Sequence, residues 1–151
     1  MKPLAYFITW TTYGTWLPGD KRGWVDRHEW GIKPGQSRLA GYAKKILKEE
    51  IVTFTKFERD IVEKAIENTC VFKKWNVHAI AIRSNHIHIV ISTDGINPKQ
   101  IMKTLKNYST RALKNIERLS NRTCMWTKGG SIRFLNDRES VSTAIEYIEN
   151  Q

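Results

Sequence analysis

The stretch Asn76-Val-His-Ala-Ile-Ala-Ile-Arg-Ser-Asn-His-Ile-His-Ile-Val-Ile-Ser92 decides the fold, because it predicts two adjacent β-strands. Apolar and β-branched residues, which favour strands, fill 76–83 and 86–92. The tight turn Ser84-Asn85 between them is typical of a β-hairpin. The sequence therefore predicts an antiparallel strand pair near the middle of the chain.

The second of these strands is expected to have two different faces. Side chains alternate along a strand, so His86, His88 and Val90 point to one side. The opposite side is apolar enough to be a core face and consists of Ile87, Ile89 and Ile91. Two imidazoles are thus expected side by side on the face that turns away from this core.

Five further elements are expected on either side of the hairpin. Two are strands, at Tyr6–Thr12 and Ile132–Leu135, the second following Gly129-Gly130. Three are helices that begin at residues suited to N-caps. The first is predicted from Thr55 to about Lys74, because Thr55 and Glu58 have the spacing of a capping box. The second is predicted from Asn97-Pro98 to about Leu119, and the third from Asp137 to the end of the chain.

This order of elements predicts an α+β protein. Two helices packed on one face of an antiparallel sheet form the ferredoxin-like arrangement, here with an additional C-terminal helix that carries Tyr147. A chain of 151 residues suits one domain, 1–151, with a sizeable core. Glycine and proline among charges predict an irregular loop over 19–38, and a short helix is expected over 39–49.

Composition narrows the class of protein. With 25 Lys+Arg against 15 Asp+Glu, the formal net charge is +10, and nucleic acid is the leading partner, with a merely basic globular protein as the alternative. Two cysteines, Cys70 and Cys124, are too few for a disulfide framework and indicate reduced thiols in a cytoplasmic protein. We expect no membrane association, because no apolar run approaches the ~20 residues that span a bilayer.

The long helix is expected to have separate apolar and basic faces. Its apolar stripe includes Tyr108, which predicts that this ring is buried, just as Val71 is expected in the apolar stripe of the preceding helix. Residues 99–133 contain nine Lys/Arg and a single acid, Glu117. This excess predicts a nucleic-acid face, with a solvated surface as the alternative. The DNA-binding candidates are Lys99, Lys103, Lys106, Arg111, Lys114, Arg118, Lys128 and Arg133.

Two weak signals suggest a reactive site. His86 and His88 at i, i+2 could bind one cation, although such a pair is more often structural or incidental, as we expect for His28 and His78. Tyr147 and Gln151 stand at i, i+4 on the last helix and so are expected to share a face. A tyrosine beside an apolar stripe is, however, most often a packing residue.

Together, these elements resemble a known family. Ser84-Asn-His-Ile-His-Ile-Val-Ile91, a basic helix and Tyr147-Ile-Glu-Asn-Gln151 are similar, in order and spacing, to the motifs of single-tyrosine HUH transposases. This family comprises the insertion-sequence 200/605 group and the REP-associated tyrosine transposases. Ile8-Thr-Trp-Thr-Thr12 also fits their first strand, whereas 16–50 looks like an insertion or a subgroup-specific segment.

The resemblance implies a mechanism and a set of roles. It implies that His86, His88 and Gln151 hold Mg²⁺ or Mn²⁺, and that Tyr147 attacks a DNA phosphate. It further implies cleavage and rejoining of single-stranded, hairpin-forming DNA through a 5′-phosphotyrosine intermediate, by a monomer or a homodimer. A phenol is a poor nucleophile at neutral pH, and a metal that polarises the phosphate would compensate for this. Asn85 could steady the turn that enters the histidine strand.

Two alternative functions stay open at this stage. One is a nuclease of the replication-initiator or relaxase type, which also pairs a His-hydrophobe-His strand with a tyrosine. The other is a non-catalytic nucleic-acid-binding module, which would expose aromatic residues on the central strands of the sheet. Trp10 and Trp16 favour packing in the core or a loop, although Tyr13 beside them could stack on bases.

Overall fold

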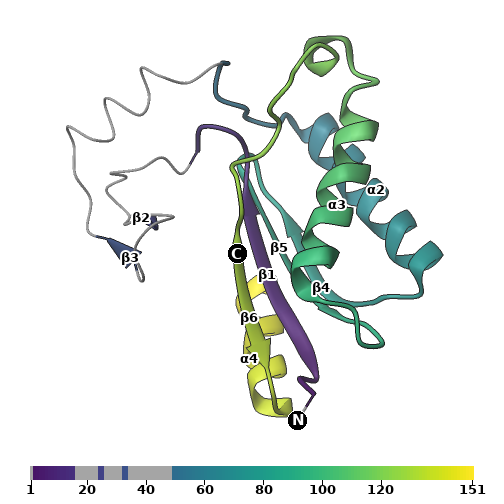
Figure 1. Ribbon diagram of the computed structural model, residues 1–151, viewed down its shortest axis with the longest axis vertical. Coiled ribbons are helices and arrows are strands. Elements are labelled where there is room, and N and C mark those ends of the chain that lie inside the picture. Colours follow the sequence, from purple (N-terminus) through teal and green to yellow (C-terminus); the bar gives the residue numbers. More distant parts are fainter. Residues whose placement is uncertain (1, 16–23, 26–31, 34–48) are drawn as a thin grey trace.

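The computed structural model describes residues 2–15, 24–25, 32–33 and 49–151, and a four-stranded antiparallel sheet forms its centre (Figure 1). The strand order is β4-β5-β1-β6, and the strands are β1 (Ala5–Thr11), β4 (Asn76–Ile82), β5 (His86–Ser92) and β6 (Ser131–Leu135). With a helix between β1 and β4 and another between β5 and β6, this is the βαββαβ order of a ferredoxin-like fold. The predicted fold class is confirmed.

The helices begin where their caps predict. They are α2 (Lys56–Lys73), α3 (Pro98–Leu113) and α4 (Arg138–Glu149). Thr55 Oγ1 accepts from the Glu58 amide at 3.2 Å, and Glu58 Oε1 accepts from the Thr55 amide at 2.9 Å, which completes the capping box. The Asn97 side chain caps α3 by accepting from the Lys99 amide, and the Asp137 side chain caps α4 by accepting from the Ser140 amide.

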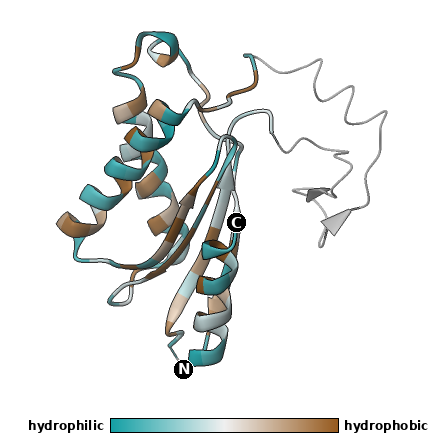
Figure 2. Cartoon of the chain, turned by 180° about the vertical axis from the view of Figure 1, so that it is seen from behind, coloured by the Kyte–Doolittle hydropathy of each residue, from teal (hydrophilic) through white to brown (hydrophobic). Residues whose placement is uncertain are grey.

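The sheet is covered on both faces. On one face, α2 and α3 enclose the larger core, in which Ile8, Ile87, Ile89 and Ile91 are fully buried. On the other face, α4 packs over a smaller core that contains Phe7 and is completed by Val90, Leu135, Ala144 and Ile148. Figure 2 shows apolar residues concentrated in the central strands and alternating polar and apolar bands along the helices. The side chains of β5, which alternate as predicted, therefore enter two cores, one on each side of the sheet.

Three sequence predictions about the helices were wrong. Helix α3 ends at Leu113 rather than near Leu119, and a short 3-10 helix, η1 (Glu117–Leu119), follows. Tyr108 is 37% exposed, and its ring lies beside the Arg111 guanidinium instead of in the core. Val71 is 79% exposed, because α2 buries Val62, Ile66 and Cys70. In both helices the buried face is narrower than the apolar stripe predicted from the sequence, so residues at the edge of that stripe face solvent.

Much of the segment predicted as an insertion lies outside the described residues. So do most of the helix expected over 39–49, His28 and Trp16. Within the predicted loop over 19–38, a short antiparallel pair is present, formed by β2 (Trp24–Val25) and β3 (Ile32–Lys33). The Val52 amide donates to the Tyr13 carbonyl at 3.0 Å, so the chain returns beside the strand end from which it left. Trp10 is buried in the core, as predicted.

No helix in the described part of the chain is long and apolar enough to cross a membrane.

An ion pair between the half-exposed Arg118 and the buried Glu58 ties η1 to the start of α2. Arg118 Nε donates to Glu58 Oε2 at 3.1 Å, and Arg118 Nη2 donates to Glu58 Oε1 at 2.5 Å and to the Thr53 carbonyl at 3.2 Å. Burial alone raises the pKa of Glu58, but the hydrogen bonds from Arg118 and Thr55 outweigh burial and hold this pKa below its ordinary value. Arg118 thus stabilises a carboxylate that is almost completely buried.

We expect Arg118→Ala to lower the free energy of unfolding by about 2–3 kcal/mol, since it leaves a buried carboxylate without its charged partner. Urea denaturation at pH 7 measures this. The matched control is Lys56→Ala, which breaks the exposed pair with Asp60 and should cost less than about 0.5 kcal/mol. Equal effects of the two variants would contradict a structural role for the Arg118–Glu58 pair.

Candidate active site

The two histidines of β5 are oriented by their neighbours. His88 lies opposite Thr9 of β1 in the sheet register, and the Thr9 hydroxyl is hydrogen-bonded to His88 Nδ1 at 2.7 Å. His86 Nδ1 is 2.8 Å from Asn85 Oδ1. This contact holds the His86 ring through its Nδ1 atom. The ring centroids of His86 and His88 are 4.7 Å apart.

His88 is the more buried of the pair and is only 8% exposed. Burial lowers its pKa, and the nearby His86 and Arg83 lower it further, to about 4. The His88 ring is therefore neutral at pH 7. A neutral imidazole is the form in which histidine binds a metal.

Tyr147 of α4 lies directly beside this pair. Its ring centroid is 5.7 Å from that of His88 and 5.9 Å from that of Phe7. The adjacent residues Ala144 and Ile148 are buried against the sheet and fix the rotation of the helix, while Tyr147 itself stays 52% exposed. The result is a phenol that is held by aromatic contacts on one side and open to solvent on the other.

Gln151 is placed differently from the expectation. Helix α4 ends at Glu149, so Tyr147 and Gln151 are not successive residues of one helical face. The backbone carbonyl of Gln151 accepts a hydrogen bond from Arg83 of the β4–β5 turn. This contact brings the last residue beside the hairpin that carries the histidines.

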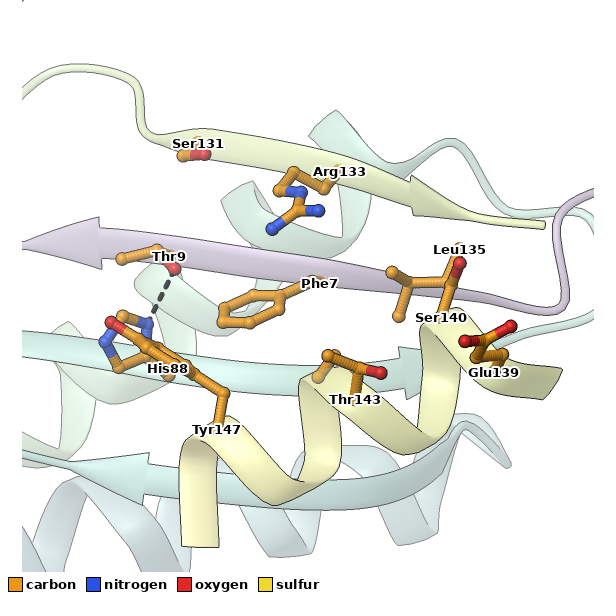
Figure 3. Close-up of a pocket in the computed structure, with 11 residues that line it drawn as sticks. Phe7, Thr9, His88, Ser131, Arg133, Leu135, Glu139, Ser140, Thr143 and Tyr147 are labelled. Carbon is orange, nitrogen blue, oxygen red and sulfur yellow. Dashed lines mark hydrogen bonds between the residues drawn. The ribbon is translucent and has the colours of Figure 1, made fainter. Parts of the chain in front are cut away.

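The tyrosine and His88 line one pocket of about 450 Å³ between α4 and the sheet (Figure 3). Its floor is formed by Phe7 and Thr9 of β1, and its rim combines residues of β6 with the first turns of α4. The remaining lining residues are Ser131, Arg133, Leu135, Glu139, Ser140, Thr143 and Ala144. Hydroxyl groups and one guanidinium therefore surround the space next to the phenol.

The basic residues of α3 lie on the far side of the sheet from this pocket. Lys99, Lys103 and Arg111 are exposed there, on the helix that packs against the larger core. The Lys106 ammonium donates to the Thr127 and Gly129 carbonyls at 3.2 and 2.6 Å, and burial lowers its pKa to about 8. Of the eight DNA-binding candidates, only Arg133 lines the pocket.

Sequence analysis did not single out Thr9, Phe7 or Arg83. Each contacts a residue that is distant in the sequence: Thr9 meets His88 through the pairing of β1 with β5, Phe7 meets Tyr147 of α4, and Arg83 meets Gln151. Asn85, predicted to steady the entry to β5, does contact His86. His78 stands at an irregularity in the β4–β5 register and bonds Ser92 Oγ at 2.8 Å, which agrees with the structural role expected for it.

The donor set suits a divalent cation that also binds substrate. In the described residues, no cluster of three His, Cys, Asp or Glu side chains is placed to hold a metal. The site instead offers two imidazoles whose Nδ1 atoms are each held by an oxygen, an arrangement found around metal-binding histidines. The backbone of Gln151 lies beside the same hairpin. These residues fit such an ion.

Fold and site define a class of α+β proteins in which a ferredoxin-like sheet carries a histidine pair and a C-terminal helix carries a tyrosine. A family model described as IS200-like transposase matches residues 40–151. The chain belongs to this family, and the predicted resemblance is confirmed. No curated protein matches the sequence.

Solved structures support the fold. One is a REP-associated tyrosine transposase bound to a REP hairpin, with 11% identity and a TM-score of 0.59; the match covers 98% of this chain and 66% of that one. The chain thus spans just under two thirds of that transposase. Another is a candidate transposase from Deinococcus radiodurans, with 15% identity and a TM-score of 0.54, covering 100% of this chain and 92% of that one.

The lowered pKa of His88 predicts an acid-sensitive fold. As pH falls from 6.5 towards 4, His88 becomes protonated in the unfolded chain but stays neutral in the folded protein. The free energy of unfolding of the metal-free protein should therefore decrease over this range. The slope is at most about 1.4 kcal/mol per pH unit. Urea denaturation at a series of pH values measures it.

The matched comparison is between His88→Gln and His78→Gln. The first should flatten the pH dependence, while the second removes an exposed imidazole of the same sheet and should leave it steep. An equally steep profile in His88→Gln would show that His88 is not the group responsible.

Proposed function

We propose that this protein is a metal-dependent transposase that cleaves and rejoins single-stranded, hairpin-forming DNA through a 5′-phosphotyrosine intermediate on Tyr147. The observation that supports this most strongly is the position of the Tyr147 phenol against His88, which itself adjoins His86. His88 of β5 and Tyr147 of α4 are about 60 residues apart in the sequence, and both line one pocket. A packing tyrosine would not need to keep half of its surface exposed beside two imidazoles.

In this proposal, the Tyr147 Oη atom attacks phosphorus in one strand of DNA. A P–O bond to the phenol forms and the P–O3′ bond breaks; the phenol loses its proton to solvent and the departing 3′ oxygen gains one. The product is a 5′-phosphotyrosine and a free 3′-OH. Attack by a 3′-OH in the reverse direction rejoins the strand and restores the phenol, so no nucleotide energy is consumed.

A Mg²⁺ or Mn²⁺ ion held by His86, His88 and Gln151 would polarise the phosphate and offset its developing charge. The other residues prepare the site. Thr9 and Asn85 fix the directions of the two imidazole rings, and burial keeps His88 neutral. The Phe7 ring lies against the Tyr147 ring.

Hairpin DNA is proposed as the substrate on the strength of two observations. The REP-associated transposase with a similar fold was solved bound to a REP hairpin. The chain also carries a net charge of +10, which favours binding to phosphates through counterion release. The exposed basic residues Lys99, Lys103, Arg111 and Lys114 stay candidates for contacts with DNA outside the pocket.

The alternative functions are less well supported. A non-catalytic ferredoxin-like module would leave one face of its sheet open for stacking bases. Here α2 and α3 cover one face, and α4 covers Phe7 and Val90 on the other. Family membership favours a transposase over a replication initiator or relaxase.

Covalent trapping tests the proposed chemistry. Labelled single-stranded hairpin DNA incubated with the protein and Mn²⁺ should give an adduct that survives denaturation and migrates with the protein on a gel. Tyr147→Phe should abolish the adduct, because the nucleophilic oxygen is gone, whereas Tyr108→Phe on the far side of the sheet should retain it. His86→Ala, His88→Ala or chelation by EDTA should reduce adduct formation by about 100-fold or more. An adduct that persists in Tyr147→Phe would overturn the assignment.

We further expect each chain to form its site with its own tyrosine, because Tyr147 contacts His88 within one chain. An equimolar mixture of Tyr147→Phe and His86→Ala proteins should therefore give no adduct, since neither chain has both groups. Recovery of adduct in the mixture would instead indicate a homodimer that exchanges the tyrosine between subunits. The control is wild-type protein diluted with Tyr147→Phe, which should keep the activity of its wild-type fraction.

A further inference from the structure

Arg133 is the cation of the active-site pocket. It projects from β6 over Phe7, towards the space in front of Tyr147 (Figure 3). Arg133 is exposed, and its side chain has neither a hydrogen bond nor an ion pair with any residue that the structure describes, although Glu139 lines the same pocket. Its guanidinium therefore has its full hydrogen-bonding capacity available for a ligand.

The sheet register brings Arg133 within reach of the proposed chemistry. His88, Thr9 and Ser131 form one row across β5, β1 and β6, and Phe7 and Arg133 belong to the next row. Neighbouring strands are about 4.8 Å apart, so an extended arginine on β6 can span β1 towards His88. Tyr147 approaches the same space from α4 and rests against Phe7.

The chemistry of the pocket suits a phosphodiester. Its lining combines the Arg133 guanidinium with the hydroxyl groups of Thr9, Ser131, Ser140 and Thr143. A guanidinium presents paired N–H donors that match the two non-bridging oxygens of a phosphate. As the phenol attacks, negative charge on those oxygens increases, and a fixed cation stabilises that state more than the ground state.

We propose that Arg133 binds the non-bridging oxygens of the phosphate that Tyr147 attacks. This inference rests on the proposed function and assigns to one residue the recognition of the scissile group. It also separates Arg133 from the basic residues of α3, which lie on the opposite side of the sheet and can contact only other parts of the DNA.

The kinetic test is single-turnover adduct formation at saturating hairpin DNA with Mn²⁺. Arg133→Gln should slow the reaction by about 100-fold, the loss typical of one transition-state donor, and Arg133→Lys should recover part of the rate. Arg138→Gln removes the same charge from the exposed first residue of α4, which does not line the pocket, and should stay within about 2-fold of wild type, because an exposed charge outside the pocket is screened.

A neutral substrate distinguishes phosphate binding from a structural role. With a methylphosphonate at the cleaved position, the reacting group has lost one charged oxygen, so wild type and Arg133→Gln should differ by less than about 5-fold. Loss of rate by the same factor on both substrates would assign Arg133 a structural role and overturn the proposal. An unchanged rate for Arg133→Gln on ordinary DNA would overturn it as well.

A second measurement does not depend on strand cleavage. Titration of the metal-free protein with inorganic phosphate, followed by NMR, should shift the Arg133 Nε–H resonance and the amides of Ser131 and Thr143, and Arg133→Gln should abolish these amide shifts. If the phosphate shifts appear but wild type forms no adduct with any hairpin, the proposed function fails while the anion site stands. The inference fails, while the proposed function stands, if the adduct forms but two results are negative. These are that phosphate causes no shift at Arg133, and that Arg133→Gln is slowed by the same factor on the methylphosphonate as on ordinary DNA.

Discussion

The antiparallel pairing of β1 with β5 is the constraint on which the rest of the structure depends. A strand in the middle of a sheet points its side chains alternately to the two faces of the sheet. The register of β5 against β1 therefore decides which β5 residues face α2 and α3 and which face α4. Ile87, Ile89 and Ile91 enter the core beneath α2 and α3, while His88 faces α4 and meets Thr9. A shift of the register by one residue would bury the imidazoles in the apolar core and separate them from Tyr147.

Because helices cover both faces, polar groups of the site lie within a packed layer. His88 is buried at the edge of the smaller core, next to Val90 and Phe7, and this position accounts for its lowered pKa. The Tyr147 phenol stays half exposed because it lies at the edge of the buried face of α4, about one turn after the buried Ala144. Packing therefore gives the two groups different environments: a buried, neutral imidazole and a half-exposed phenol.

Much of the fold could be predicted from local signals. The N-caps Thr55, Asn97 and Asp137, together with the alternation along β5, specify elements through contacts between neighbours in the sequence. Predictions failed where tertiary packing decides how wide an apolar stripe is, as at Tyr108 and Val71, or where a helix ends, as at Leu113. Arg118 illustrates the same limit, since its partner Glu58 lies 60 residues away.

The sequence by itself determined the chemical groups: two histidines on one strand face, a tyrosine near a C-terminal helix end and a surplus of 10 positive charges. Only the tertiary structure decided which of those groups meet. It placed the basic face of α3 behind the sheet, brought Arg133 and Tyr147 to one pocket, and supplied Thr9 to orient His88. The physical reason is that spacing along a chain fixes the face of an element, whereas proximity between elements depends on strand order and register.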